Sequence, residues 1–181
     1  MKLYLARHGE TDENARRAYV GWQNPPLNQQ GHAQATALIT QLQTEPIAAI
    51  YASDLTRARQ TVQPIATARN LPVQTDSRWR ELHFGRWEGL TFAEIDAVER
   101  EWLERWLSNP EAVAPPGGET LAQLRSRILQ ALPQTENALV VTHGGPIRAL
   151  IAHLTGRPFW SIPVPPGSVT CIEKGELLWS R

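Results

Sequence analysis

Apolar residues along this chain fall into short runs that alternate with longer amphipathic segments, the pattern typical of a mostly parallel α/β sheet. Five short apolar runs predict strands, at residues 2–6, 47–52, 138–142, 169–173 and 176–179. Segments with apolar positions every three or four residues predict helices, one between Asn28 and Pro46 and others at about 55–69, 120–132 and 146–154. We therefore expect a three-layer α/β/α sandwich with one antiparallel edge strand.

Polar residues and prolines mark the expected ends of these helices. We expect Asn28 to cap the first helix, and Ser53 or Asp54 to cap the second. Pro46 should end the first helix. Pro146 suits the first turn of the last helix, because an N–H missing there would have no intrahelical partner anyway.

Two segments interrupt the regular alternation of strands and helices. Residues 9–26 are polar and predict a long loop with one helical turn, and loops of that length are often functional. Residues 78–118 are rich in Trp, Glu and Arg and end in Pro-Pro-Gly-Gly. We expect this cap segment, 78–118, to be a helical insertion over the strand ends. At 181 residues, the whole of 1–181 is expected to form one domain.

Composition and charge narrow the classes of function. Eighteen basic and eighteen acidic residues balance, so no electrostatic signal for nucleic acid or an anionic membrane is present. The single cysteine, Cys171, lies in an apolar run and is expected to be buried and inert. No apolar run approaches about 18 residues, and no apolar leader precedes the first strand. We expect a cytoplasmic protein without a membrane span.

Histidines follow two of the predicted strands, in Arg7-His8-Gly9 and in Thr142-His143-Gly144. Open α/β sheets bind ligands at the carboxyl ends of their strands, and the two imidazoles would lie close together if these strands are neighbours. A guanidinium donates a rigid fork of hydrogen bonds to phosphate, and imidazole is a nucleophile near neutral pH. The pattern predicts phosphoryl chemistry.

Arg57 supplies a further cation at the start of the second long helix. The helix dipole opposes a cation in the first turn, so Arg57 calls for an anionic partner, whereas Arg59 faces elsewhere as a surface charge. Zinc is the rival ligand for His8 and His143, but the neighbouring arginines would repel it and no third ligand stands out. We rank anion binding above metal binding and expect no metal and no cofactor.

Glu81 lies in a glycine-punctuated aromatic stretch between Arg80 and Gly89, a setting that suits a proton donor. Spacing alone does not separate Glu81 from Glu88. The remaining histidines are interpreted as structural or surface residues: His32, His83 and His153.

Taken together, these blocks resemble the histidine phosphatase superfamily, also called phosphoglycerate-mutase-like. The blocks occur in the same order along nearly the whole chain: Arg7-His8-Gly9-Glu10-Thr11, Asn14, Ser53-Asp54-Leu55-Thr56-Arg57-Ala58, Glu81-Leu82-His83-Phe84-Gly85 and Thr142-His143-Gly144. Within the superfamily, the stretches 84–89 and 115–120 are most similar to the α-ribazole phosphatase and broad-specificity phosphatase branch.

The resemblance implies roles for individual residues. His8 would be the nucleophile that forms a phosphohistidine, with its other ring nitrogen oriented by a backbone carbonyl, and Glu81 would act first as general acid and then as general base. The phosphate oxygens would be bound by Arg7, Asn14, Arg57, His143 and the backbone N–H of Gly144. Candidate contacts to the rest of the substrate are Thr11, Gly21, Trp22 and Trp87.

The resemblance further implies a phosphomonoester hydrolase acting on a small phosphorylated metabolite. We favour α-ribazole 5′-phosphate, because five tryptophans near the expected mouth suit a flat aromatic group: Trp22, Trp79, Trp87, Trp102 and Trp106. The spacing of Trp102 and Trp106 also fits a core position for both. Alternatives are phosphoserine, sugar phosphates and the reaction of a cofactor-dependent phosphoglycerate mutase, although such mutases generally have longer caps. A non-catalytic phosphate-binding module would show degenerate catalytic positions. A homodimer through the last strand and Trp179 is also expected.

Overall fold

The computed structural model describes residues 2–181. Its strands are β1 (Lys2–Arg7), β2 (Ala49–Ala52), β3 (Val73–Thr75), β4 (Ala138–Thr142), β5 (Val169–Glu173) and β6 (Glu176–Ser180). Its α-helices are α1 (Asp12–Ala15), α2 (Gln29–Gln41), α3 (Thr56–Arg69), α4 (Phe92–Ser108), α5 (Leu121–Ala131) and α6 (Gly144–Thr155). Short 3₁₀ turns are η1 (Ser77–Trp79), η2 (Gly85–Trp87) and η3 (Phe159–Ser161).

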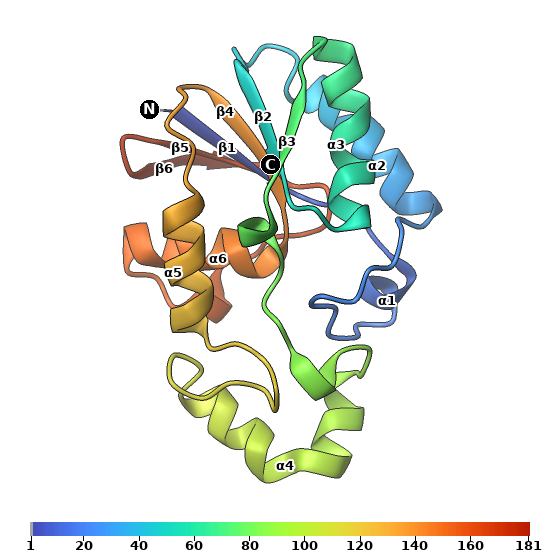
Figure 1. Cartoon of the computed structure of the whole chain (residues 1–181), viewed down its shortest axis with the longest axis vertical. Helices are drawn as coiled ribbons and strands as arrows, with labels where there is room; N and C mark the ends of the chain where they lie inside the picture. The colour runs from blue at the N-terminus through green and yellow to red at the C-terminus, as the bar shows by residue number, and fades with distance from the viewer. Residues whose placement is uncertain (1) are drawn as a thin grey trace.

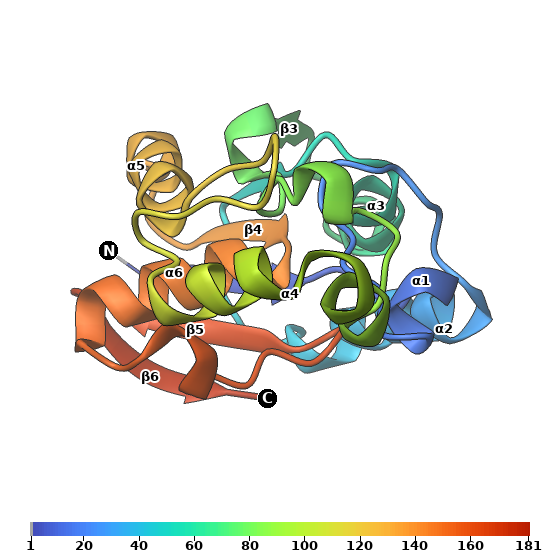
Figure 2. The same ribbon diagram turned by 90° about the horizontal axis from the view of Figure 1, so that it is seen from below.

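The six strands form one sheet in the order β3-β2-β4-β1-β5-β6. The first four strands of the chain are parallel, whereas β5 is antiparallel to β1 and β6 is antiparallel to β5. Helices α2 and α3 cover one face and α5 and α6 cover the other (Figures 1 and 2). The predicted three-layer α/β/α fold is confirmed. The antiparallel strand β5 lies one place inside the edge, because the Lys174-Gly175 turn adds β6 beyond it.

Alternating side chains of β1 build two hydrophobic cores. Leu3 and Leu5 pack on the side of α5 and α6, and Tyr4 and Ala6 pack on the side of α2 and α3. All five residues of β4 are buried, as a central parallel strand requires. Cys171 is also fully buried, and this burial raises the pKa of its thiol. Its predicted burial is confirmed.

The structure confirms one predicted cap and corrects another. Asn28 caps α2 by accepting a hydrogen bond from the N–H of Gly31 at 2.8 Å. Neither Ser53 nor Asp54 caps α3, whose N-cap residue is Leu55 and has no side-chain cap bond. Asp54 instead binds the guanidinium of Arg80 at 2.8 and 2.5 Å. That pairing occupies the carboxylate that a cap would need.

Two further boundaries differ from the predictions. Helix α6 begins at Gly144, two residues before the expected start, because His143 already has the extended backbone of an N-cap residue. Strand β3 was not predicted, since it has only three residues and two of them are exposed. It pairs with β2 at the edge of the sheet.

The cap segment contributes η2 and the kinked helix α4, which lies beyond the C-terminal ends of β1 and β4 (Figure 1). Trp106 of α4 is fully buried, but Trp102 is 39% exposed and its indole N–H donates to the carbonyl of Ala114. The core position that the spacing allows for both tryptophans is therefore found for Trp106 and not for Trp102.

The C-terminal strand brings Trp179 against Tyr4 of the same sheet, with ring centroids 6.3 Å apart. A homodimer through this edge stays a prediction. Within residues 2–181, no helix combines the length and apolar character needed to cross a bilayer.

Candidate active site

The two histidines that follow strands lie side by side. Strands β1 and β4 are adjacent and parallel, with Arg7 paired to Thr142, so His8 and His143 come next on both strands. Their ring centroids are 4.9 Å apart in an edge-to-face arrangement, and both side chains are buried. The predicted meeting of the two imidazoles at the sheet edge is confirmed.

The ring of His8 has its two nitrogens in different environments. Nδ1 lies 2.6 Å from the carbonyl oxygen of Gly9, and we assign Nδ1–H as the donor. Nε2 then keeps its lone pair and accepts a hydrogen bond from Nε of Arg57 at 3.3 Å. Burial, and then the positive charges of Arg57 and Arg7, lowers the pKa of His8 well below its ordinary value. Nε2 is therefore available as a neutral nucleophile at neutral pH.

Gly9 allows helix α2 to approach the loop after β1 very closely. A Cβ atom at residue 9 would lie 2.4 Å from the carbonyl oxygen of Gly31, and a Cβ at residue 31 would lie 2.1 Å from that of Glu10. Two glycines facing each other therefore let the backbone pack directly on the first turn of α2. This contact fixes the path of the chain immediately after His8.

Arg57 is fully buried, although most arginines in the first turn of an amphipathic helix are solvated. Its guanidinium donates to the carbonyl oxygens of Gly21 at 2.7 Å and Gln23 at 2.8 Å. Burial lowers the pKa of Arg57 to about 10, so the side chain remains a cation at neutral pH. A fixed positive charge is thus held against His8. Arg59 is exposed, as predicted.

Two buried nitrogens beside His8 have no hydrogen-bond partner among the residues that the structure describes, namely Nε of Arg7 and Nδ1 of His143. The other ring nitrogen of His143 is 2.9 Å from the hydroxyl of Ser53. Nε of Arg7 lies at the start of α6, 3.6 Å from the position of a Cβ on Gly144. An unpaired buried polar group costs about 1–3 kcal/mol. The arrangement suits a ligand that supplies acceptor oxygens, such as a tetrahedral anion.

The carboxylate of Glu81 is held at the N-terminus of α6. It accepts hydrogen bonds from the backbone N–H of Gly145 at 2.9 and 3.1 Å and from that of Leu82 at 2.8 Å. Only 9% of Glu81 is exposed. A Cβ atom at residue 145 would lie 2.0 Å from one oxygen of this carboxylate, so any larger residue there would displace the Glu81 side chain from this position. The N-terminus of α6 therefore carries His143 as its N-cap residue and, one residue into the helix, the N–H group that binds Glu81.

Glu88, which spacing could not separate from Glu81, has a different position. Its carboxylate accepts hydrogen bonds from the backbone N–H groups of Trp22 at 2.8 Å and Gln23 at 2.6 Å. It thereby holds the loop whose carbonyl oxygens bind Arg57. The two carboxylates therefore differ in position: that of Glu81 is bound at the N-terminus of α6, and that of Glu88 binds a loop.

Thr11 and Asn14 form the capping box of α1. The Thr11 hydroxyl accepts from the N–H of Asn14 at 3.2 Å, and Oδ1 of Asn14 accepts from the N–H of Thr11 at 3.3 Å. Asn14 also lines a cavity of about 350 Å³ beside Arg7. The other residues that line this cavity are Glu10, Arg17, Ala18, Tyr19, Phe92 and Pro166.

Of the tryptophans expected near the mouth, Trp22 alone has a substantially exposed ring beside Glu81. It is 40% exposed, stacks on His83 with ring centroids 4.6 Å apart, and donates its indole N–H to the carbonyl of Glu81 at 3.0 Å. Trp79 and Trp87 are both 1% exposed. The indole N–H of Trp87 donates to Glu99 inside the cap segment, which removes Trp87 from the candidate substrate contacts.

Ser53 and Gly145 are site residues that sequence reasoning missed. Ser53 precedes a helix, where a hydroxyl normally indicates a cap, and it instead contacts His143. Gly145 had no signal of its own beyond its place after the His-Gly pair. Within residues 2–181, no cluster of three or more His, Cys, Asp or Glu side chains is arranged to hold a metal ion.

The lowered pKa of His8 leads to a measurable expectation. Burial and two neighbouring cations disfavour the imidazolium, so the His8 C2–H proton resonance should stay at its neutral position as the pH falls from about 8 through the ordinary histidine pKa of about 6.5. The signal is assigned by its loss in His8→Ala, and the titration is followed by NMR. A midpoint at or above the ordinary value would contradict the electrostatic description of the site.

Comparisons with known proteins agree with this geometry. A family model described as histidine phosphatase superfamily (branch 1) matches residues 3–179. Phosphoserine phosphatase 1 of Hydrogenobacter thermophilus is 33% identical over 97% of this chain and 88% of the relative. The probable phosphoglycerate mutase GpmB of Shigella dysenteriae is 32% identical over 99% and 87%. The structure of the α-ribazole phosphatase from Shigella flexneri superimposes with a TM-score of 0.85 at 29% identity, covering 98% of this chain and 93% of that one.

Proposed function

This chain belongs to the histidine phosphatase superfamily, and from that premise we propose that it hydrolyses phosphomonoesters through a phosphohistidine on His8. The observation that carries the proposal is the state of His8, whose Nδ1 is bonded to a backbone carbonyl while Nε2 keeps its lone pair beside Arg57. The two unpartnered donors on Arg7 and His143 add support, because phosphate oxygens would satisfy both.

In the first step, Nε2 of His8 attacks phosphorus in line with the ester oxygen. The P–O bond breaks, its electron pair goes to the leaving oxygen, and Glu81, which enters this step as the protonated acid, supplies the proton that neutralises that oxygen. Arg7, Arg57 and His143, with Asn14 and the N–H of Gly144, stabilise the charge on the three equatorial oxygens. When the Ser53 hydroxyl donates to Nε2 of His143, Nδ1–H of His143 is the donor to phosphate.

In the second step, water attacks the phosphorus of the phosphohistidine. Glu81, now a carboxylate, takes the proton from that water, and the electron pair of the broken P–N bond returns to Nε2. The residues around His8 supply fixed positive charge from Arg7 and Arg57, the part that a divalent cation plays elsewhere. We therefore propose a mechanism that needs no metal.

For the substrate, we propose α-ribazole 5′-phosphate. The α-ribazole phosphatase named above is a close structural neighbour, and the Trp22 ring, 40% exposed beside Glu81 and flanked by His83 and Arg80, offers an aromatic contact for the benzimidazole.

Phosphoserine is the second candidate, favoured by a different observation. Arg17 lines the cavity next to Arg7 and would pair with a carboxylate on the leaving group. A relative carries the name phosphoserine phosphatase 1.

Competing phosphomonoesters tested by kcat/KM decide between these substrates. We expect α-ribazole 5′-phosphate to exceed phosphoserine and 3-phosphoglycerate by roughly 10-fold or more. All rates are measured without 2,3-bisphosphoglycerate, with and without millimolar chelator. A preference for phosphoserine would make phosphoserine the proposed substrate, with its carboxylate bound in the cavity that Arg17 lines. A loss in chelator that zinc or magnesium restores would contradict the metal-free mechanism.

A further inference from the structure

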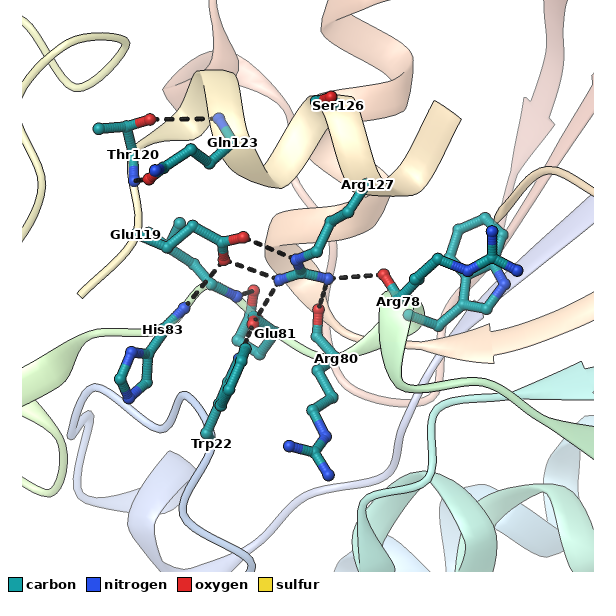
Figure 3. Close-up of polar contacts among 12 residues, drawn as sticks. Trp22, Arg78, Arg80, Glu81, His83, Glu119, Thr120, Gln123, Ser126 and Arg127 are labelled. Atoms are coloured by element: carbon teal, nitrogen blue, oxygen red, sulfur yellow. Dashed lines mark hydrogen bonds and ion pairs between the residues drawn. The ribbon is translucent and has the colours of Figure 1, made fainter. Parts of the chain in front are cut away.

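Arg127 of α5 binds both the segment that carries Glu81 and the carboxylate of Glu119 (Figure 3). It donates to the main-chain carbonyls of Arg78 at 2.6 Å, Arg80 at 2.7 Å and Glu81 at 2.8 Å. Its other two bonds, of 2.7 and 2.8 Å, go to the carboxylate of Glu119. A guanidinium has five N–H donors, so every one of them is engaged.

Glu119 binds the main chain on the C-terminal side of Glu81, at His83. One of its carboxylate oxygens accepts the N–H of His83 at 3.2 Å, and its own N–H donates to the carbonyl of His83 at 2.9 Å. The side chains of Arg127 and Glu119 are only 17% and 13% exposed. We call this pair the Arg127–Glu119 brace.

The loop that the brace binds has no regular backbone hydrogen bonding of the kind found in a helix or a sheet. Residues 80–84 lie between η1 and η2 and belong to no helix or strand. Side chains from outside the loop that bind its main chain are those of the brace, Trp22, whose indole N–H donates to the carbonyl of Glu81, and Glu88, which accepts the N–H of Phe84 at 3.3 Å. The two ends of the loop also join the flanking turns, through Arg80 N–H to Ser77 and Trp87 N–H to Phe84. The carboxylate of Glu81 must nevertheless meet the N–H of Gly145, 64 residues away in the chain, at 2.9 Å.

We propose that the Arg127–Glu119 brace positions Glu81 for proton transfer to the leaving group, an inference that rests on the proposed function of Glu81. Arg127 and Glu119 are positioning residues, because they bind the main chain around Glu81 and leave its carboxylate free to act. A misplacement of a reacting group by about 1 Å costs on the order of 100-fold in rate. The alternative is that the pair only fastens α5 to the loop 78–83 and contributes to stability.

A leaving-group series separates these two roles. Protonation by Glu81 matters for alkyl and phenyl phosphates, whose leaving oxygens are basic, and matters little for 2,4-dinitrophenyl phosphate. We expect Arg127→Met to lower kcat/KM roughly 10- to 100-fold for the poor leaving groups and to leave the dinitrophenyl ester nearly unchanged. kcat/KM is the right quantity because it reports the steps up to loss of the leaving group.

Arg125 supplies a matched control on the same helix. It pairs with Glu111 at 2.7 Å on the surface and has no bond to the loop 78–83. Arg125→Met should therefore leave the whole series unchanged. Arg127→Lys keeps the charge and loses the fork, so it should show the selective loss at smaller amplitude, even if Arg127→Met fails to fold. Glu119→Gln should follow the same direction.

Glu81→Gln, measured in the same series, distinguishes a failure of the brace proposal from a failure of Glu81 as the acid. If Glu81→Gln is selective for poor leaving groups and the Arg127 variants lower all substrates equally, the positioning role is overturned and the acid stands. If Glu81→Gln itself lowers all substrates equally, the assignment of Glu81 as the acid fails, and the brace proposal fails with it. Selective loss in both supports the proposal.

Discussion

His8→Ala is expected to lower kcat on any phosphomonoester by on the order of 10⁴-fold or more. The variant removes the nitrogen that we propose attacks phosphorus, whereas Arg7, Arg57 and His143 would still hold the phosphate. Substrate should therefore bind with little loss of affinity, and turnover should disappear. The measurement is steady-state hydrolysis of an aryl phosphate, with binding of inorganic phosphate or vanadate followed separately.

His153 supplies the matched control for this substitution. It lies exposed on α6, the helix that begins at His143, so His153→Ala removes an imidazole without touching the site. It should keep its full rate. Turnover within about 10-fold of the parent in a folded His8→Ala variant would contradict nucleophilic catalysis at this position.

Glu81→Gln is expected to produce the second large effect, and it should depend on the leaving group. The amide oxygen of glutamine can still accept from the N–H of Gly145, so the geometry is preserved while the transferable proton is lost. kcat/KM on an alkyl phosphate should fall by roughly 10²- to 10⁴-fold, the range of a general acid. kcat/KM on the dinitrophenyl ester should stay nearly parental, because its leaving group needs no proton.

The same variant should also fail in the second half of the reaction. With no carboxylate to take a proton from water, the phosphohistidine should persist after a good leaving group has departed. Stopped-flow measurement with 2,4-dinitrophenyl phosphate should show a burst of dinitrophenolate, about one per active site, followed by slow turnover.

Glu88→Gln is the control for Glu81→Gln. Glu88 accepts from the N–H groups of Trp22 and Gln23 and takes no part in the proposed proton transfer, so Glu88→Gln should depend much less on the leaving group than Glu81→Gln does. Equal losses across the leaving-group series for Glu81→Gln, or a dependence on the leaving group in Glu88→Gln as large as that in Glu81→Gln, would contradict the assignment of the acid.

The meeting of His8 with His143 was predictable because both follow apolar runs that form neighbouring parallel strands. The position of Arg57 was predictable for the same reason, since its helix follows β2, which pairs with β4. Each of these residues belongs to a local sequence motif that follows a strand. The parallel sheet brings the motifs together at the carboxyl ends of its strands.

What the sequence could not predict depends on contacts between distant segments. Arg127 stands on an amphipathic helix, where an arginine normally indicates a solvated face, and only the fold shows that it reaches the loop at 78–81. The aromatic residues show the same limit. Periodicity cannot tell that Trp87 is buried or that Trp102 is exposed, because both depend on how the cap segment packs.

The most direct test of the account is to trap the phosphoenzyme of the wild-type chain. The enzyme is mixed with an excess of 2,4-dinitrophenyl phosphate and quenched in alkali, where a phosphohistidine survives, and peptides are mapped by tandem mass spectrometry. We expect a phosphate on His8 that is released by acid. A phosphate on any other residue, or rapid hydrolysis with no phosphorylated His8 at any quench time, would contradict it.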